Sequence, residues 1–315
     1  MYKKLTFTLL IAALALLCTC KKDSSNQIVT KPYLPPGKYL LFDSDQQFNN
    51  GLSGFPSLYT SIYYANLDGT GITRITPFEG TYYSYRASFS PDGTQIVYTR
   101  GDLADTGRGI CIIDITGKNF KRIVKGDEAD YACFSPDEGR VAYAKSLVHA
   151  KPYKYDIYTA NTDGTSERRL TNFAADNGSV SNIHWSADGN IYFNGSSDRN
   201  KAGIYSVDKT GNNLKYVLYG GELLGVSPDS KSLLTDQSNG LFTTNTDGTN
   251  MKTLIAYDEN NPNMLLGASW SSDGSLIFLS NTNLPGNQLG IFRVNSSGYG
   301  LQKVLDGFYE YPSIH

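Results

Sequence analysis

The heptapeptide Ala87-Ser88-Phe89-Ser90-Pro91-Asp92-Gly93 is the first full copy of a motif that recurs along the chain. Four related copies occupy residues 132–137, 183–189, 224–229 and 268–274. The Pro-Asp-Gly end suits a tight turn, because proline presets φ, aspartate bonds its own backbone and glycine accepts a positive φ. A strand-like run follows every copy, at residues 95–99, 140–144, 190–193, 232–235 and 275–279. Each copy therefore predicts two strands joined by a tight turn.

A second motif alternates with the first. It reads Ile62-Tyr63-Tyr64-Ala65-Asn66-Leu67-Asp68-Gly69 and returns at residues 110–117, 157–164, 204–211, 241–248 and 291–298. The spacing of roughly 40 to 50 residues is typical of β-propeller repeats. Its Asp-Gly end favours a hairpin for the same backbone reasons. Each unit thus contains four short strands, which make one antiparallel propeller blade.

The chain ends supply the one motif copy that is missing, since the second motif occurs six times and the first five times. The terminus Pro312-Ser313-Ile314-His315 aligns with residues 87–90, and residues 35–38 align with residues 91–94. The sequence therefore predicts an all-β, six-bladed β-propeller with four-stranded blades. Its N- and C-terminal strands share one blade, which leaves no open sheet edge.

Taken together, the two repeats resemble those of the TolB-type propeller family, whose WD-like repeats are marked by Ser-Pro-Asp-Gly. The resemblance covers residues 36–315 and implies a six-bladed propeller. The α/β domain that precedes the propeller in TolB itself has no counterpart in these residues. The resemblance therefore implies the fold and not the role of TolB.

The first residues resemble an export signal. A basic start is followed by an apolar run over residues 5–17, which is shorter than the roughly 20 residues that span a bilayer and matches a secretory signal. Leu17-Cys18-Thr19-Cys20 then resembles a bacterial lipoprotein signal, which implies lipidation of Cys20. Lipidation of Cys18 and an ordinary cleaved signal peptide are the alternatives.

This interpretation divides the chain into three parts. We expect a lipoprotein signal peptide over residues 1–19, a tether over residues 20–36 and the propeller over residues 37–315. The expected location is outside the cytoplasm, anchored to the outer membrane through lipid, on its periplasmic or surface face.

Charge and motif content disfavour several functions. The net charge is −2, and loss of Lys3 and Lys4 with the signal changes it to −4 (−2 − 2), whereas nucleic-acid-binding domains are strongly basic. The sequence holds no Gly-x-Ser-x-Gly elbow and no His-Glu-x-x-His or His-x-x-x-His spacing. Residues 159–170 approach a calcium loop but end in leucine where a glutamate ligand belongs. We expect no metal, no cofactor, no catalytic residue and no nucleic-acid partner.

The candidate binding site lies just before the innermost strands, whose equivalent ends converge on one mouth of the central channel of a propeller. Tyrosine offers stacking area and a hydroxyl group to a ligand, although tyrosine is also common in strands for packing reasons alone. The candidate residues are Tyr83, Tyr85, Arg86, Asp130, Tyr131, His184, Tyr309, Glu310 and Tyr311. The other histidines that could act as bases are His149 and His315.

Two further features leave alternatives open. Cys111 and Cys133 fall on non-equivalent strands, so two separate buried thiols are favoured over the disulfide that an exported protein permits. The insertions at residues 46–61 and 146–156 outgrow a simple turn, and residues 152–155 form an aromatic and basic segment that we expect to be exposed.

Two function classes remain. The first is an envelope-anchored, non-catalytic module that binds an envelope protein or a peptide at its channel mouth. The second is a carbohydrate-binding or lyase-like propeller. Whether the protein is an enzyme stays open, but an enzyme should gather histidines, carboxylates or metal ligands at one mouth, and this sequence gathers mostly tyrosines.

Overall fold

The computed structural model describes residues 38–44, 60–77, 82–102, 108–125, 128–147, 153–257, 265–284, 288–307 and 309–314. The predicted signal peptide, the tether, Cys20, His149 and His315 lie outside these residues. Within them, no helix is long and apolar enough to cross a membrane.

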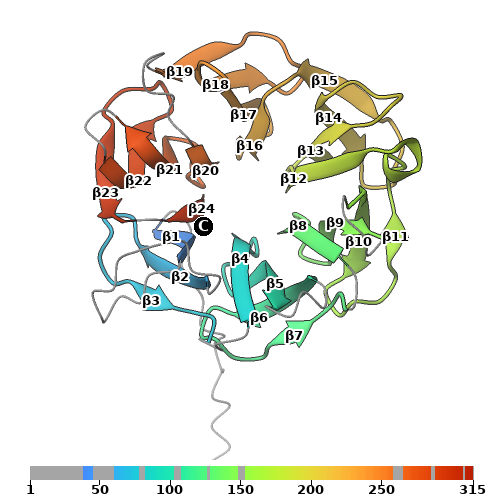
Figure 1. Cartoon of the computed structure of the whole chain (residues 1–315). Coiled ribbons are helices and arrows are strands. Elements are labelled where there is room, and N and C mark those ends of the chain that lie inside the picture. Colours follow the sequence, from blue (N-terminus) through green and yellow to red (C-terminus); the bar gives the residue numbers. More distant parts are fainter. Residues whose placement is uncertain are drawn as a thin grey trace, which may run out of the picture. The chain divides into compact units, whose positions relative to one another are not determined.

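Six four-stranded antiparallel sheets form a ring (Figure 1), and this confirms the predicted fold. Blade 1 holds, from the innermost strand outward, β24 (Glu310–Ile314), β1 (Tyr39–Ser44), β2 (Ser61–Asn66) and β3 (Thr73–Arg74), and the other blades follow the same order. Blade 2 holds β4 (Tyr82–Phe89), β5 (Gln95–Asp102), β6 (Gly109–Asp114) and β7 (Lys121–Arg122). Blade 3 holds β8 (Glu128–Phe134), β9 (Arg140–Ser146), β10 (Tyr155–Asn161) and β11 (Arg168–Arg169).

The other three sheets continue the ring in chain order. Blade 4 holds β12 (Ser179–Trp185), β13 (Asn190–Ser196), β14 (Gly203–Asp208) and β15 (Lys215–Tyr219), preceded by the short 3-10 helix η1 (Ala174–Asp176). Blade 5 holds β16 (Glu222–Val226), β17 (Ser232–Gln237), β18 (Gly240–Asn245) and β19 (Lys252–Ala256). Blade 6 holds β20 (Leu265–Trp270), β21 (Leu276–Leu284), β22 (Gln288–Asn295) and β23 (Gln302–Asp306).

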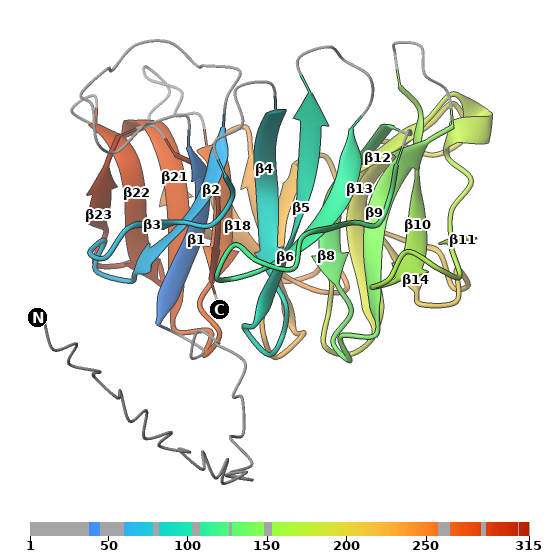
Figure 2. The ribbon, with the colours of Figure 1, turned by 90° about the horizontal axis from the view of Figure 1, so that it is seen from below.

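The two ends of the propeller chain complete blade 1 together, as predicted. Strand β24 pairs antiparallel with β1, with Leu40 opposite Ile314 and Leu41 opposite Ser313. Figure 2 shows these strands side by side, one from each end of the colour scale. The edge that β1 would otherwise expose is therefore covered by a strand from the other end of the chain.

The core lies between the blades, because successive residues of a strand face opposite sides of its sheet. Leu40 and Phe42 pack toward blade 6, whereas Leu41 packs toward blade 2. The described residues form six buried apolar clusters, one between each pair of neighbouring blades. The two motif repeats thus supply the apolar surfaces that hold the ring together.

The Ser-Pro-Asp-Gly turns are closed by their own polar side chains. The Ser90 hydroxyl donates to Asp92 Oδ1 at 2.7 Å, and the Thr94 N–H donates to the same oxygen at 2.9 Å. The same serine-to-aspartate bond recurs at Ser135, Ser227 and Ser271. These aspartates satisfy the turn backbone, which agrees with the structural role that the sequence predicts for them.

The glycines of the Asp-Gly turns have a second function, which is to let neighbouring blades approach. Gly248 has a φ of +85°, and a Cβ atom there would lie 2.2 Å from the carbonyl oxygen of Val217 in blade 4. A Cβ atom would likewise lie within 3.0 Å of a carbonyl oxygen of the preceding blade at five equivalent glycines, namely Gly69, Gly117, Gly164, Gly211 and Gly298. Only glycine combines this conformation with this close approach.

Two sequence expectations concern cysteines and the insertion before β10. Cys111 and Cys133 are both buried and free, so they form two separate thiols as favoured above. The expected exposure of residues 152–155 is wrong for the part that the structure describes. Tyr153 packs against the cluster between blades 3 and 4, and Tyr155 is only 8% exposed.

Candidate functional site

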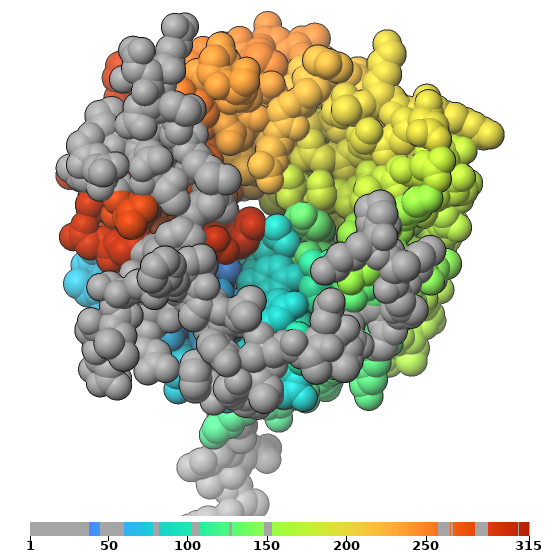
Figure 3. All heavy atoms as spheres, viewed as in Figure 1, coloured from blue at the N-terminus to red at the C-terminus, as the bar shows by residue number. Residues whose placement is uncertain are grey.

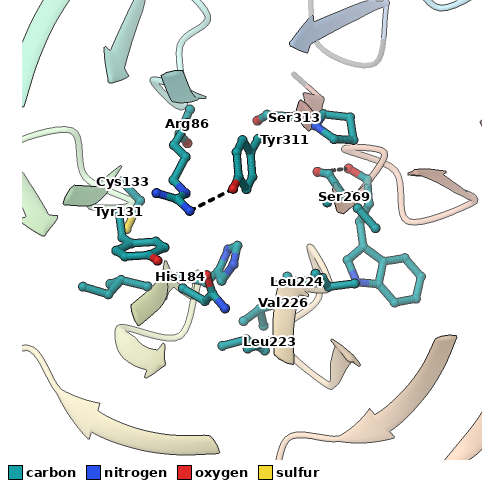
Figure 4. A pocket seen from close by; sticks show the side chains of 18 of the residues that line it. Arg86, Tyr131, Cys133, His184, Leu223, Leu224, Val226, Ser269, Tyr311 and Ser313 are labelled. Carbon is teal, nitrogen blue, oxygen red and sulfur yellow. Dashed lines mark hydrogen bonds between the residues drawn. The ribbon is translucent and has the colours of Figure 1, made fainter. Parts of the chain in front are cut away.

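A cavity of about 520 Å³ lies at the centre of the ring, and all six innermost strands contribute to its wall. Figure 3 shows the ring hollowed at its centre, and Figure 4 shows side chains that line the cavity. The wall runs from the polar residues Arg86, Tyr131, Asn182 and Tyr311 to the turn residue Pro228. We call the end of the cavity formed by those four polar residues the channel mouth.

A β-bulge in the innermost strands places these polar side chains. In β4 the pairing shifts between Tyr85 and Ser88, so that two residues, Arg86 and Ala87, face a single residue of β5. Equivalent shifts occur in β8, β12 and β24. The first bulged residue has a left-handed φ in all four strands, at Arg86 (51°), Tyr131 (57°), Asn182 (49°) and Tyr311 (49°).

Such conformations are uncommon for residues other than glycine and concentrate at functional sites. A bulge also redirects a side chain out of the regular alternation. Here it turns an arginine, two tyrosines and an asparagine toward the cavity.

Arg86 occupies the channel mouth between two aromatic rings. Its guanidinium carbon lies 4.2 Å from the centre of the Tyr131 ring and 4.5 Å from that of Tyr311. Nη1 donates to Asp130 Oδ2 at 2.9 Å, and Nη2 donates to the Tyr311 hydroxyl at 2.8 Å (Figure 4). Burial by itself lowers the pKa of Arg86, but Asp130 and the neighbouring tyrosines Tyr131 and Tyr311 together outweigh it and raise that pKa. Arg86 is therefore a fixed positive charge.

A second arginine, Arg108, contacts the same carboxylate from the residue before β6. Its Nε donates to Glu128 Oε2 at 2.9 Å, and its Nη1 donates to Asp130 Oδ2 at 3.1 Å. The same Nη1 donates to the Tyr85 hydroxyl at 3.2 Å, and Nη2 donates to the Tyr155 hydroxyl. Sequence reasoning missed Arg108, because it lies outside the repeated motifs.

Asp130 connects these groups. It is 1% exposed, and its Oδ1 accepts bonds from the Thr99 hydroxyl at 2.9 Å and from the Tyr131 N–H at 2.8 Å. The carboxylate therefore has donors on both oxygens, which fixes Arg86 and Tyr131 at the mouth. Satisfied hydrogen bonds at a buried carboxylate make its surroundings rigid.

The remaining predicted site residues are divided between the channel and the core. His184 lines the cavity, and burial lowers its pKa to about 4, so its ring is neutral at pH 7. The Tyr83 ring stacks on that of Tyr85, with 5.5 Å between the ring centres. Tyr309 does not lie at the mouth. It is 3% exposed in the cluster between blades 6 and 1, where its ring packs edge-on against Phe42.

Glu310 is the first residue of β24 and lies directly opposite Asp43 of β1. The same position in blade 5 places Glu222 of β16 opposite Asp236 of β17. Sequence reasoning missed Asp43, Glu222 and Asp236. Alignment of the repeats could have found them, since each occupies the repeat position of Tyr85 or of its cross-strand partner Thr99.

Reactive groups are few in the described part of the chain. Cys133 lines the cavity, but burial raises the pKa of its thiol to about 12, so it is not a thiolate at neutral pH. Burial likewise raises the pKa of Cys111 to about 12. No group of three or more His, Cys, Asp or Glu side chains among these residues could hold a metal ion.

These observations define a class of protein, a closed six-bladed propeller whose central cavity has one polar, aromatic mouth. No protein-family model and no curated protein matches the chain. Solved structures do match, and they show that the fold is of the TolB type.

TolB from Acinetobacter baumannii superposes with a TM-score of 0.66 at 16% sequence identity, over 88% of this chain and 66% of that one. The protein assigned as TolB from Agrobacterium tumefaciens has a TM-score of 0.61 at 13% identity, over 86% of this chain and 90% of that one. Hydrazine synthase from Kuenenia stuttgartiensis has a TM-score of 0.70 at 14% identity, over 89% of this chain and 47% of that one. The chain thus spans just under two thirds of the Acinetobacter TolB chain and about half of the hydrazine synthase chain.

An oligogalacturonate lyase in complex with manganese also matches, with a TM-score of 0.52 at 13% identity, over 70% of this chain and 68% of that one. At identities this low the likeness establishes the fold alone.

Proposed function

We propose that the protein is an envelope-anchored lipoprotein whose propeller binds a protein segment or peptide at its channel mouth, without catalysis. The observation that carries this proposal is the set of bulges that turn Arg86, Tyr131, Asn182 and Tyr311 toward the cavity. Four strained backbone positions at equivalent places are not needed to close a blade, because β16 runs through the same place without a left-handed residue. They are explained by a site that must present these side chains.

The likeness to TolB structures supports a propeller that serves as a scaffold. The envelope location and the lipid anchor rest on the N-terminal sequence, where Cys20 follows an apolar run. Both remain part of the proposal.

A carbohydrate-binding or lyase-like propeller is the second candidate. One observation favours it: the cavity is lined by both hydroxyl groups and aromatic rings, which a sugar ligand needs. These belong to Ser88, Ser269, Ser313, Tyr131 and Tyr311. The match to an oligogalacturonate lyase agrees with it. We rank it second because His184 has no hydrogen-bonding partner among the described residues that would make it a base.

The test is photo-crosslinking in living cells. A short diazirine-bearing amino acid replaces Ser269 or Ser313, which line the cavity and do not contact the Arg86 network. The matched control places the probe at Thr253 on the outer strand β19, which is exposed. We expect a discrete protein adduct from both inner positions and none from the control.

The absence of a protein adduct from both inner positions would overturn the proposal. Binding of an oligosaccharide to the purified full-length protein would then favour the second candidate. Radiolabelled palmitate, incorporated by the wild type and lost in a Cys20→Ala variant, tests the anchor separately.

A further inference from the structure

The second residue of the recurring Ala87–Gly93 motif faces the channel in each blade. In β4, its neighbours Ala87 and Phe89 pack into the core between blades 1 and 2. Successive residues of a strand face opposite sides, so Ser88 between them faces the channel. All six equivalent residues line the central cavity. We call them the inner ring, and they are Ser88, Cys133, His184, Gly225, Ser269 and Ser313.

The inner ring carries no charge at neutral pH. Serine hydroxyls do not ionise there, and burial raises the pKa of the Cys133 thiol to about 12. Burial also lowers the pKa of His184 to about 4, and no neighbouring charge contributes to that shift. Two charged residues of the described chain line the cavity, Arg86 and Glu222, and each precedes the inner-ring residue of its strand and is hydrogen-bonded within the protein. The inner ring is therefore an uncharged layer of the cavity next to a charged mouth.

Three members of the inner ring have hydrogen-bonding groups that no other described residue engages. They are the hydroxyls of Ser88 and Ser313 and the imidazole of His184. These three residues are half-buried, and Figure 4 shows the His184 ring pointing into the cavity. By contrast, the Ser269 hydroxyl donates to the carbonyl oxygen of Trp270 at 3.2 Å. The inner ring thus presents hydrogen-bonding groups from blades 1, 2 and 4 to the cavity.

These groups fit a ligand group that is uncharged and that both donates and accepts hydrogen bonds. A serine hydroxyl and a neutral imidazole each offer one donor and at least one acceptor. A carboxamide offers two N–H donors and a carbonyl acceptor at one end, so a single carboxamide can engage partners on more than one blade. A carboxylate or an ammonium group would leave water without a counter-ion in this layer, which is costly. Gly225 contributes no side chain, which leaves space at the blade 5 side of the ring.

We propose that the inner ring binds the uncharged carboxamide side chain of an asparagine or a glutamine in the segment that enters the channel mouth. This inference rests on the proposed function and specifies its ligand. The carboxamide bonds to the hydroxyls of Ser88 and Ser313 and to the His184 ring. A lysine or glutamate side chain is rejected at the same place, because the ring offers it no opposite charge. A single hydroxyl group offers only one donor and satisfies fewer of the three ring groups.

The test uses three small compounds of similar size that differ in charge, namely propionamide, propionate and propylammonium. The chain has 3 histidines, so full-length protein labelled with ¹³C in histidine gives few ring signals, and each compound is titrated at pH 7 while the His184 signal is followed by NMR. We expect propionamide to shift this signal in a saturable way. The two charged compounds should bind at least about tenfold more weakly, because each must leave water without a counter-ion.

A Ser88→Ala/Ser313→Ala double variant removes two of the proposed hydrogen bonds and should lose at least about fivefold in affinity for propionamide. The matched control is a Ser238→Ala/Ser297→Ala double variant, which removes the same groups from two exposed positions outside the cavity. It should change the affinity by less than about twofold. An equal loss in both variants would overturn the inference.

The wild-type titration stands by itself if a variant fails to fold. The His184 signal is the one that a His184→Gln variant lacks, and it is also recognised because burial keeps its ring neutral down to about pH 5. Equal shifts from all three compounds, or a shift from none, would overturn the inference. A shift from methyl glucoside and none from propionamide would overturn it and favour the carbohydrate candidate. A crosslinked protein adduct in cells would still support the proposed function after any of these results.

Discussion

At the residue scale, His184 and Arg86 line one cavity, and burial by itself lowers the pKa of both side chains. Arg86 keeps its charge because Asp130 lies 2.9 Å away. His184 has no such partner among the described residues, so burial alone acts on it and lowers its pKa from 6.5 to about 4. Burial therefore leaves His184 neutral, whereas the carboxylate beside Arg86 keeps that side chain charged.

This difference predicts a pH dependence of stability. The unfolded chain protonates His184 near pH 6.5 and the folded chain only near pH 4. The contribution of neutral His184 is thus fully present above pH 6.5 and is lost as the pH falls to 4. Between pH 7 and pH 4.5, the unfolding free energy of the wild type should therefore fall by about 2 kcal/mol more than that of a His184→Gln variant.

The measurement is urea unfolding at both pH values, followed by tryptophan fluorescence. Asp236 acts in the opposite direction, because its raised pKa of about 6 gives stability that grows as the pH falls toward 3.8. The comparison of variant with wild type removes this contribution. Equal losses in both proteins would mean that His184 does not titrate as described.

At the element scale, the turns and bulges combine two constraints. The turn at Gly248 needs a positive φ for the hairpin and an absent side chain for the neighbouring blade. The bulge at Tyr131 needs a left-handed φ that tyrosine rarely adopts, and it is held there by Arg86 and Asp130. Local geometry is therefore stabilised by contacts from other blades.

Two glycine variants separate these constraints. Gly248 and Gly189 have φ values of +85° and +90°, but a Cβ atom at Gly248 meets the Val217 carbonyl oxygen at 2.2 Å, whereas at Gly189 nothing lies within 4 Å. Gly189→Ala should cost about 1 to 2 kcal/mol for the backbone conformation alone. Gly248→Ala should cost at least about 1 kcal/mol more, because the blades must move apart.

Chemical denaturation of the two variants and the wild type gives both costs. Equal destabilisation would show that the close approach between blades 4 and 5 relaxes without cost.

At the scale of the whole molecule, closure of the ring joins residues that are far apart in the sequence. Strand β24 lies against β1 in blade 1, and its Tyr311 contributes to the channel mouth with Arg86 of blade 2. Closure of the sheet and assembly of the site are thus one event. Loss of β24 should remove both.

A chain that ends at Gly307 tests this dependence. It exposes the edge of β1, so we expect the melting temperature to fall by at least about 10 °C, or the protein to aggregate. Circular dichroism and size-exclusion chromatography measure the two outcomes. A synthetic peptide of residues 308–315 should restore the melting temperature by pairing with β1, whereas a peptide with the same residues in scrambled order should not. A truncated chain that melts like the full-length protein would show that β24 does not close the ring.

Much of this architecture follows from the sequence alone. The repeated Ser-Pro-Asp-Gly and Asp-Gly turns predict hairpins, their spacing predicts blades, and the offset between the two motifs predicts that the chain ends share blade 1. These features are local and periodic, so each copy reinforces the others. The sequence also predicts that Arg86, Asp130, Tyr131 and Tyr311 belong to the binding site, because they lie just before a recurring motif.

Only the tertiary structure decides which of the neighbouring residues take part. Tyr309 and Tyr311 are two positions apart, yet one packs against Phe42 in the core and the other lies at the mouth, because a bulge changes the direction of the second. Arg108 joins the network from outside any repeat, and Glu310 lies opposite Asp43 only because of the cross-strand register. A turn depends on residues that are adjacent in the sequence. A binding site depends on contacts between blades, which no single repeat contains.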